Sequence, residues 1–178
     1  MIRTLMLAAT ASLALAACAT TEADMAADAA AAAGDMTPTN RGAYVEMAAA
    51  SDLFEIQSGR MAAERAQSPA VRQFGQMLVQ HHTQTTAQLA AAATAAGTPP
   101  TPDLMPMQVT MMAQLRDASG SEFDATFARI QVQAHEMALA LHSNYARNGD
   151  TPALRAVASA AVPVVQQHLN QARSMAGA

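Results

Sequence analysis

The chain has 178 residues, of which 51% are hydrophobic and only 3% are aromatic, and its formal net charge is −4. All ten basic residues are arginines scattered along the sequence, so there is no basic cluster of the kind that neutralises nucleic-acid phosphates. The single cysteine excludes an intramolecular disulfide.

Residues 1–17 are predicted to form a signal peptide. Arg3 precedes an apolar run from Leu5 that is too short to span a bilayer as a helix. The run ends in "LAAC", which resembles the lipobox of bacterial lipoproteins, so Cys18 is expected to carry lipid and to anchor the protein to a membrane. Ala19 follows the cysteine, and this favours the outer membrane of the bacterial cell envelope, with the protein facing the periplasm.

Residues 18–40 are predicted to be a disordered tether, because alanine, threonine and acidic residues dominate and large apolar side chains are nearly absent. Residues 41–178 then form one domain, which glycine and proline divide into helices. The expected helices are 42–67, 69–96, a short piece at 105–118, 121–147 and 151–175. Ser68 and Ser121 are the expected caps of the second and the third long helix.

These segments predict an all-α four-helix bundle, with the short extra helix in the connection between helices two and three. Apolar residues recur every three or four positions, and no segment alternates as a half-buried strand does. Short connections imply that helices one and two are antiparallel neighbours, as are helices three and four. The longer connection, residues 97–120, either crosses the bundle or covers one end.

Histidines fall on the inner faces of the predicted helices. At about 100° per residue, His82 lies within roughly 20° of the centre of its apolar stripe, whereas His81 lies roughly 80° to one side. His81 is therefore expected at the margin or in water. His168 lies inside the stripe of the last helix, and His135 and His142 share a flank of the third long helix that can face a second neighbour.

Glu55 lies on the small-residue arc of the first helix, and it is close to the middle of that helix, as His82 and His135 are of theirs; His168 is about one turn past the middle. Helix midpoints share one layer in such a bundle. We therefore predict a site for one metal ion formed by Glu55, His82, His135 and His168, with Zn, Cu, Ni or Fe as the candidates, because imidazole is a common ligand of all four metals. The alternative is a buried layer in which these side chains only hydrogen-bond to one another.

The sequence resembles a bacterial family catalogued as domain of unknown function 4142, whose members are similar to the ferritin-like superfamily. The resemblance rests on "YVEMAAASDLFEIQSGRMAAERAQSPAVRQFGQMLVQHHTQTTAQL", "QVQAHEMAL" and "AVPVVQQHLNQA", which contain Glu55, His82, His135 and His168. His81 stands where the family usually has aspartate. The resemblance implies a ferritin-like bundle in an exported, often membrane-associated protein, without an established activity.

Three functions follow as hypotheses. The first is a lipid-anchored envelope or stress-related protein that binds one metal ion, without catalysis. The second is a metal-dependent redox enzyme; a carboxylate-bridged di-iron centre is disfavoured, because no glutamate is followed three residues later by histidine. The third is a structural or interaction module with a buried polar layer. The sequence predicts no particular protein partner.

A methionine-rich stretch, "MPMQVTMM" at residues 105–112, raises the separate possibility of a soft Cu(I) site. The alternative is that Met107, Met111 and Leu115 form the apolar face of a short helix. Motifs for nucleophilic catalysis and for phosphate binding are absent from the sequence.

Overall fold

The computed structural model describes residues 37–177, so the expected signal peptide, Cys18 and most of the expected tether lie outside the described residues. Five helices fill the described range: α2 (Arg41–Arg65), α3 (Pro69–Ala95), α4 (Pro106–Asp117), α5 (Gly120–Asn148) and α6 (Pro152–Ala176). Residues 37–177 contain no strand. The all-α prediction is confirmed, and every predicted helix boundary falls within two residues of the observed one.

The helices start where proline and polar caps favour them. Asn40 caps α2 by accepting a 2.9 Å hydrogen bond from the amide of Ala43, and Pro69 and Pro152 occupy first-turn positions of α3 and α6. Ser68 is the N-cap residue of α3, as predicted, but its side chain makes no cap hydrogen bond. The prediction for Ser121 was wrong, because α5 starts at Gly120 and its N-cap residue is Ser119.

A carboxylate from another helix binds the backbone just before the start of α3. The two oxygens of Asp124, in α5, accept hydrogen bonds from the amides of Gln67 and Ser68, at 3.1 and 2.7 Å. This contact ties the turn between α2 and α3 to the beginning of α5. Because the partner is distant in sequence, local cap rules do not reveal it.

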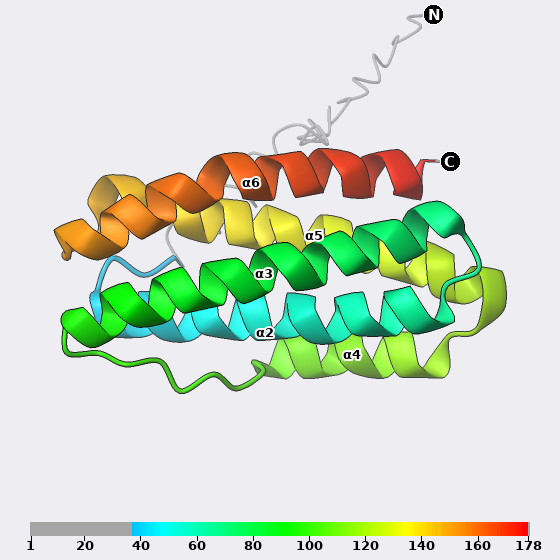
Figure 1. The fold of residues 1–178 in the computed structure, drawn as a ribbon, viewed down its shortest axis with the longest axis horizontal. Helices are drawn as coiled ribbons and strands as arrows, with labels where there is room; N and C mark the ends of the chain where they lie inside the picture. Colours follow the sequence, from blue (N-terminus) through cyan, green and yellow to red (C-terminus); the bar gives the residue numbers. More distant parts are fainter. Residues whose placement is uncertain (1–36, 178) are drawn as a thin grey trace, which may run out of the picture.

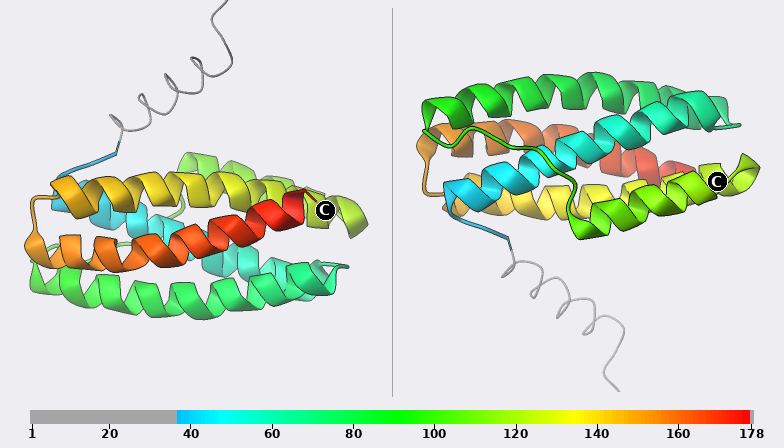
Figure 2. Two further views of the ribbon diagram at one scale, coloured as in Figure 1. Left: turned by 90° about the horizontal axis from the view of Figure 1, so that it is seen from above. Right: turned by 90° about the horizontal axis from the view of Figure 1, so that it is seen from below.

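The four long helices form two antiparallel hairpins, α2 with α3 and α5 with α6 (Figures 1 and 2). The hairpins contact each other through α2 with α5 and through α3 with α6. The connection that contains α4 crosses the length of the bundle, and α4 packs against α2 and α5 (Figure 1). Of the two paths left open for residues 97–120, the structure therefore has the crossing one.

A polar layer separates two apolar clusters along the bundle. One cluster contains Phe54, Phe74, Phe123, Phe127 and Ile130, and the other contains Tyr44, Leu89, Leu141, Tyr145 and Leu154. The buried polar side chains of the described residues are Asp52, Glu55, Ser58, His82, Gln131, His135, His142 and His168. The polar side chains predicted at the helix midpoints are therefore buried together, and the layer contains more polar groups than the sequence predicted.

Helices α2 and α3 approach closely because two glycines face each other one turn from this layer. A Cβ atom on Gly59 would lie 2.7 Å from the carbonyl oxygen of Gly75, and one on Gly75 would lie 2.6 Å from that of Gly59. Contacts this short with backbone atoms require the helices to move apart. The glycine pair therefore sets the helix spacing at which Asp52 of α2 reaches His82 of α3.

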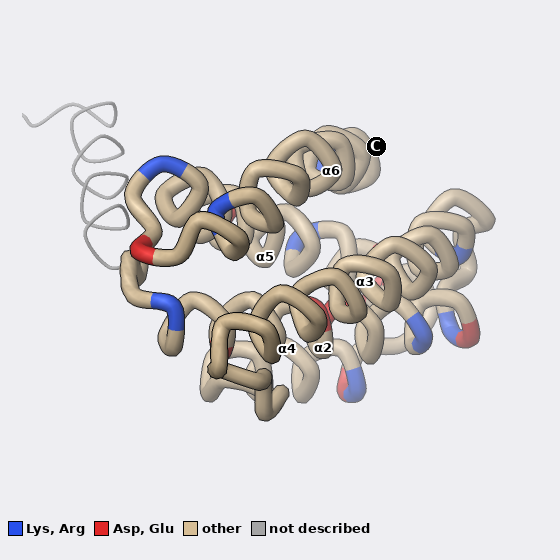
Figure 3. Tube along the Cα trace, turned by 60° about the vertical axis from the view of Figure 1, so that its left-hand side comes forward, with Lys and Arg blue, Asp and Glu red and all other residues tan. Residues whose placement is uncertain are grey.

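Arginines and acidic residues are scattered over the helices and turns of the described chain and form no basic face (Figure 3). Among residues 37–177, none of the helices has the length and apolar character that crossing a membrane requires.

Candidate metal centre

Three of the four predicted ligands converge in the polar layer. His82 of α3, His135 of α5 and His168 of α6 are 5%, 1% and 0% exposed. Each of them offers one ring nitrogen, and the three nitrogens lie within 4.8 Å of one another. Three helices therefore supply three imidazoles to a single point in the interior.

The pair from α5 and α6 already has the spacing of two ligands on one ion. Nε2 of His135 lies 3.3 Å from Nδ1 of His168. Two nitrogens that are each about 2.0–2.1 Å from a tetrahedral Zn ion would lie about 3.3–3.4 Å apart. The opposite nitrogen of His135, Nδ1, donates a 2.8 Å hydrogen bond to the carbonyl of Gln131 one turn earlier. A neutral His135 therefore has no proton on Nε2, which is free to bind a cation.

Asp52 orients the third imidazole. Its carboxylate accepts a 2.8 Å hydrogen bond from Nδ1 of His82, together with hydroxyl hydrogen bonds from Thr85 at 2.9 Å and Thr86 at 3.2 Å. Nε2 of His82 is buried and has no hydrogen-bond partner. Asp52 was not among the predicted ligands, although it lies one turn after the buried Ala48 on α2.

Glu55 lies beside the three histidines and not among them. Its Oε1 is 3.8 Å from Nδ1 of His135, the ring nitrogen that faces away from His168, and its Oε2 is buried without a hydrogen-bond partner. The carboxylate does not belong to the group of atoms that lie within 4.8 Å of one another. Direct coordination by Glu55 stays a prediction, and as placed the residue supplies a nearby negative charge.

His81 lies at the margin of the cluster, one of its two expected positions, and from there it contacts His168. It is only partly buried, but its Nδ1 lies 2.8 Å from Nε2 of His168 and its ring stacks on that ring, with 5.1 Å between centroids. A helix in a bundle contacts two neighbours, so a residue 80° from the stripe centre of α3 still reaches α6. His81 therefore supports His168 from outside the cluster.

Burial and charge set the protonation of the cluster. Burial, together with the smaller effect of positive charge on the neighbouring His135, His82 and His81, lowers the pKa of His168 to about 3. Burial also lowers the pKa of His135. Burial alone would lower the pKa of His82, but its hydrogen bond to Asp52 and the charges of Glu55 and Asp52 outweigh burial, so this pKa is raised. Two of the three imidazoles are thus held neutral, the form that binds metal.

The family model described as domain of unknown function (DUF4142) matches residues 25–175. The chain belongs to the DUF4142 family. No curated protein matches the sequence.

Solved structures share the fold of this DUF4142 chain. The structure named "CopM in the Cu(II)-bound form" aligns with a TM-score of 0.68 and 18% identity, over 80% of this chain and 98% of that one. "CopM in the Cu(I)-bound form" aligns with a TM-score of 0.64 and 17% identity over 76% and 94%, and "CopM in the Ag-bound form (by co-crystallization)" with 0.63 and 16% over 76% and 93%. At these identities the likeness establishes a common helical-bundle fold.

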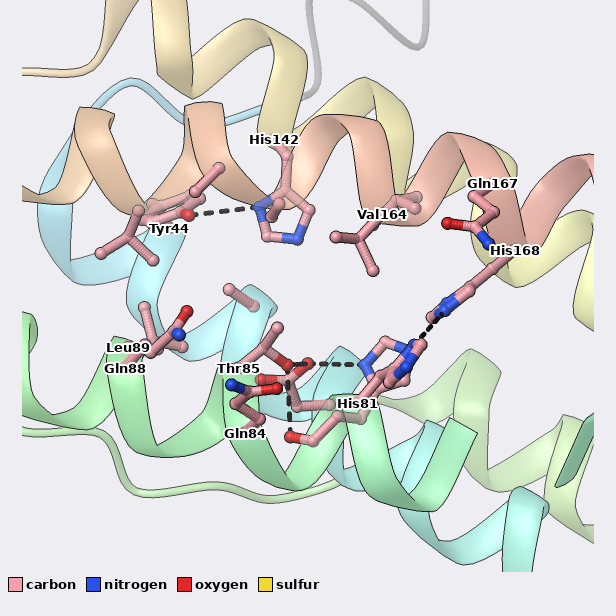
Figure 4. A pocket seen from close by; sticks show the side chains of 17 residues that line it. Tyr44, His81, Gln84, Thr85, Gln88, Leu89, His142, Val164, Gln167 and His168 are labelled. Atoms are coloured by element: carbon pink, nitrogen blue, oxygen red, sulfur yellow. Dashed lines mark hydrogen bonds and ion pairs between the residues drawn. The ribbon is translucent and has the colours of Figure 1, made fainter. Parts of the chain in front are cut away.

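A pocket of about 330 Å³ leads from the surface of this DUF4142 bundle to the histidines (Figure 4). His82 and His168 line it, with His81 beside them, and α3 and α6 form its sides. The hydrogen-bonded pair Tyr44 and His142 lies across the pocket from His81 and His168 (Figure 4). Two of the three interior imidazoles, His82 and His168, are therefore reachable from solvent.

The methionine-rich stretch does not form one site in this DUF4142 chain. Met111 and Met112 are 4% exposed and belong to the apolar cluster with Leu115, whereas Met107 is 49% exposed. Met105 and Met107 line a different pocket, between α2 and α5. The helix-face interpretation holds for Met111 and Leu115, and Met107 departs from it.

Proposed function

We propose that this protein is a lipid-anchored DUF4142 protein of the bacterial envelope whose bundle binds one transition-metal ion through His82, His135 and His168. The observation that carries the proposal is the orientation of the three rings. On each ring, one nitrogen faces the shared centre and the other has a hydrogen-bonding partner outside it: Asp52, the Gln131 carbonyl or His81. Metal-binding histidines characteristically have such outer partners, which fix the ring and its tautomer.

The hydrogen-bonding pattern of the buried polar atoms favours a bound metal over a layer held by hydrogen bonds alone. The ring contacts can be satisfied in one chain, in which His135 donates to Gln131, His168 donates to His135, and His81 donates to His168. That chain leaves Nε2 of His82 and Oε2 of Glu55 buried without partners. An unmet polar atom in the interior costs about 1–3 kcal/mol. A cation at the centre would give Nε2 of His82 a partner, and its positive charge would stabilise the buried carboxylate of Glu55.

Copper is the metal we propose first. Three imidazoles suit copper, zinc, nickel and iron alike, so the ligands alone do not choose among them. Structures with the same fold are named as Cu(II)-, Cu(I)- and Ag-bound forms of CopM, and this supports copper for the present chain. Asp52 and Glu55 beside the centre balance the charge of a divalent ion.

The test uses full-length protein purified without a polyhistidine tag, titrated with Cu(II) and with Zn(II) against a competing chelator. The variants are His135→Phe and, as the matched control, His142→Phe. Both histidines are buried in α5 one heptad apart, but only His135 belongs to the cluster. We expect one ion per chain, at least tenfold weaker binding in His135→Phe, and unchanged binding in His142→Phe. Equal binding by the two variants would remove the proposed site.

The anchoring part of the proposal has its own test. Cys18 follows an apolar leader in the pattern of a lipoprotein signal. Replacement of Cys18 by serine prevents lipidation and is expected to move the protein from the membrane fraction to the soluble fraction of the envelope. A Cys18→Ser protein that stays with the membrane contradicts lipid anchoring and leaves the metal proposal untouched.

A further inference from the structure

The pocket beside the histidines is built asymmetrically. Its sides are mainly apolar and include Val157, Val164 and Leu89, and the exposed Gln84 and Gln88 lie toward solvent. At one end it exposes the cluster through His82 and His168. At the other end lies His142, which is only 9% exposed. A volume of about 330 Å³ is at the lower end of the range for small-molecule sites.

The cluster offers three ring nitrogens, and the Glu55 carboxylate is not among the grouped atoms. The Glu55 carboxylate approaches His135 from the ring nitrogen that does not face the centre. Structural zinc sites are closed by four protein ligands, whereas sites that exchange ligands keep a fourth position open. Because His82 and His168 line the pocket, an open position on an ion held there is accessible from it.

His142 presents a hydrogen-bond donor to the same pocket. The hydroxyl of Tyr44 lies 3.2 Å from Nδ1 of His142. Burial raises the pKa of Tyr44 above its usual value and lowers the pKa of His142 to about 4, so at neutral pH the phenol donates and the imidazole accepts. A neutral His142 that accepts at Nδ1 has its proton on Nε2. Nε2 has no hydrogen-bond partner among residues 37–177.

We propose that this pocket binds a small neutral molecule that coordinates the metal through a nitrogen atom and accepts a hydrogen bond from Nε2 of His142 through a carbonyl oxygen. The inference rests on the proposed metal site and assigns it an exogenous ligand. The carboxylate of Asp52 lines the same pocket and disfavours an anionic ligand of equal size. His135 and His142 are seven residues apart, about 10 Å along α5, so the molecule must be longer than a single five-membered ring.

The experiment uses full-length Cu(II)-loaded protein and three probes that share one metal-binding nitrogen. These are 1-methylimidazole, imidazol-1-ylacetamide, which adds a carbonyl, and imidazol-1-ylacetate, which adds a charge. Binding is followed by the Cu(II) EPR and visible spectra. We expect the amide to bind about fivefold more tightly than 1-methylimidazole, as one neutral hydrogen bond allows, and more tightly than the acetate.

Two variants locate the effect. His142→Phe keeps a ring of similar shape without the donor and is expected to bind the amide and 1-methylimidazole equally. Val164→Phe fills the pocket one turn before His168 and is expected to weaken all three probes at least tenfold. Val109→Phe, a matched change at an exposed position of α4, should have no effect. Circular dichroism and copper content confirm that each variant is folded and loaded.

The outcomes separate the two proposals. If copper binds but no probe changes its spectra at millimolar concentration, the ligand inference is wrong and the metal site stands. If the amide shows no preference in the wild type, or keeps its preference in His142→Phe, the assignment to His142 is wrong. If copper does not bind at all, the metal proposal fails and the inference fails with it.

Discussion

Acid stability provides a test of the neutral state of His142. This residue is buried beside Tyr44, and burial lowers its pKa from 6.5 to about 4, with positive charge on His82 acting in the same direction against the opposing effect of Asp52. Its folded pKa is depressed. The stability linked to it is therefore present above pH 6.5 and is lost as the pH falls through the window from about 6.5 to about 4, because only the unfolded chain takes up the proton there.

The size of the effect follows from the two pKa values. A shift from 6.5 to about 4 corresponds to at most about 3.4 kcal/mol, at 1.36 kcal/mol for each pH unit. Between pH 7 and pH 4.5 most of this is lost, so His142 alone should lower the free energy of unfolding by about 2–3 kcal/mol. That is a large part of the total stability of an ordinary domain.

The assay is urea unfolding of the metal-free protein at pH 7 and at pH 4.5, for the wild type and for His142→Phe. The variant lacks the titrating group, so its free energy of unfolding should fall by about 2–3 kcal/mol less than that of the wild type over the same pH interval. Taking the difference cancels the change in packing and the titration of the other histidines. Identical pH dependence in the two proteins would show that His142 is not held neutral by burial.

Three other perturbations test neighbouring parts of the structure. Asp52→Asn removes the charge that orients His82 and is expected to weaken metal binding 10–100-fold in a chelator competition, whereas Glu136→Gln, at an exposed ion pair with Arg173, should leave affinity unchanged. His81→Ala removes the outer partner of His168 and should weaken metal binding about tenfold. A neutral His168 that binds metal through Nδ1 carries its proton on Nε2, so His81→Asp keeps an acceptor for that proton; equal loss in both variants would exclude this role. Gly75→Ala forces α2 and α3 apart and should cost about 1–3 kcal/mol in urea unfolding, whereas Gly42→Ala, where an added Cβ meets nothing closer than 3.7 Å, should be nearly neutral.

The helices and the interior histidines were predictable because local rules determine them. Pro69 and Pro152 mark helix starts through their fixed φ and missing amide proton, which are properties of single residues. The helical repeat of 100° then places His82 and His168 on inner faces without knowledge of the partner helices. Both predictions use only the backbone geometry of one helix.

The contacts of Asp52 and His81 were not predicted, for a shared reason. Each lies toward the edge of the inner face of its helix, where a single-helix projection predicts partial exposure. In the bundle, however, that edge contacts the adjacent helix, so Asp52 of α2 reaches His82 of α3 and His81 of α3 reaches His168 of α6. Which edge meets which neighbour depends on helix packing, and a one-helix calculation does not contain that information.

The orientation of the Glu55 side chain could not be predicted from helix periodicity. Its height and direction on α2 are as predicted, and its carboxylate is buried beside His135. Whether it faces the centre or the back of that ring depends on side-chain rotation, which backbone periodicity does not set. The predicted four-residue site is therefore seen as three converging histidines with a neighbouring carboxylate.

The polar layer also links the proposed function to folding. Polar side chains lie between two apolar clusters, and Glu55, His82 and Gln131 each have a buried atom without a partner. Each such atom lowers the free energy of unfolding of the metal-free bundle by about 1–3 kcal/mol. An ion that binds only the folded chain raises the free energy of unfolding, by about 2.7 kcal/mol at a free concentration one hundred times its Kd. Metal binding would then raise the free energy of unfolding of the bundle.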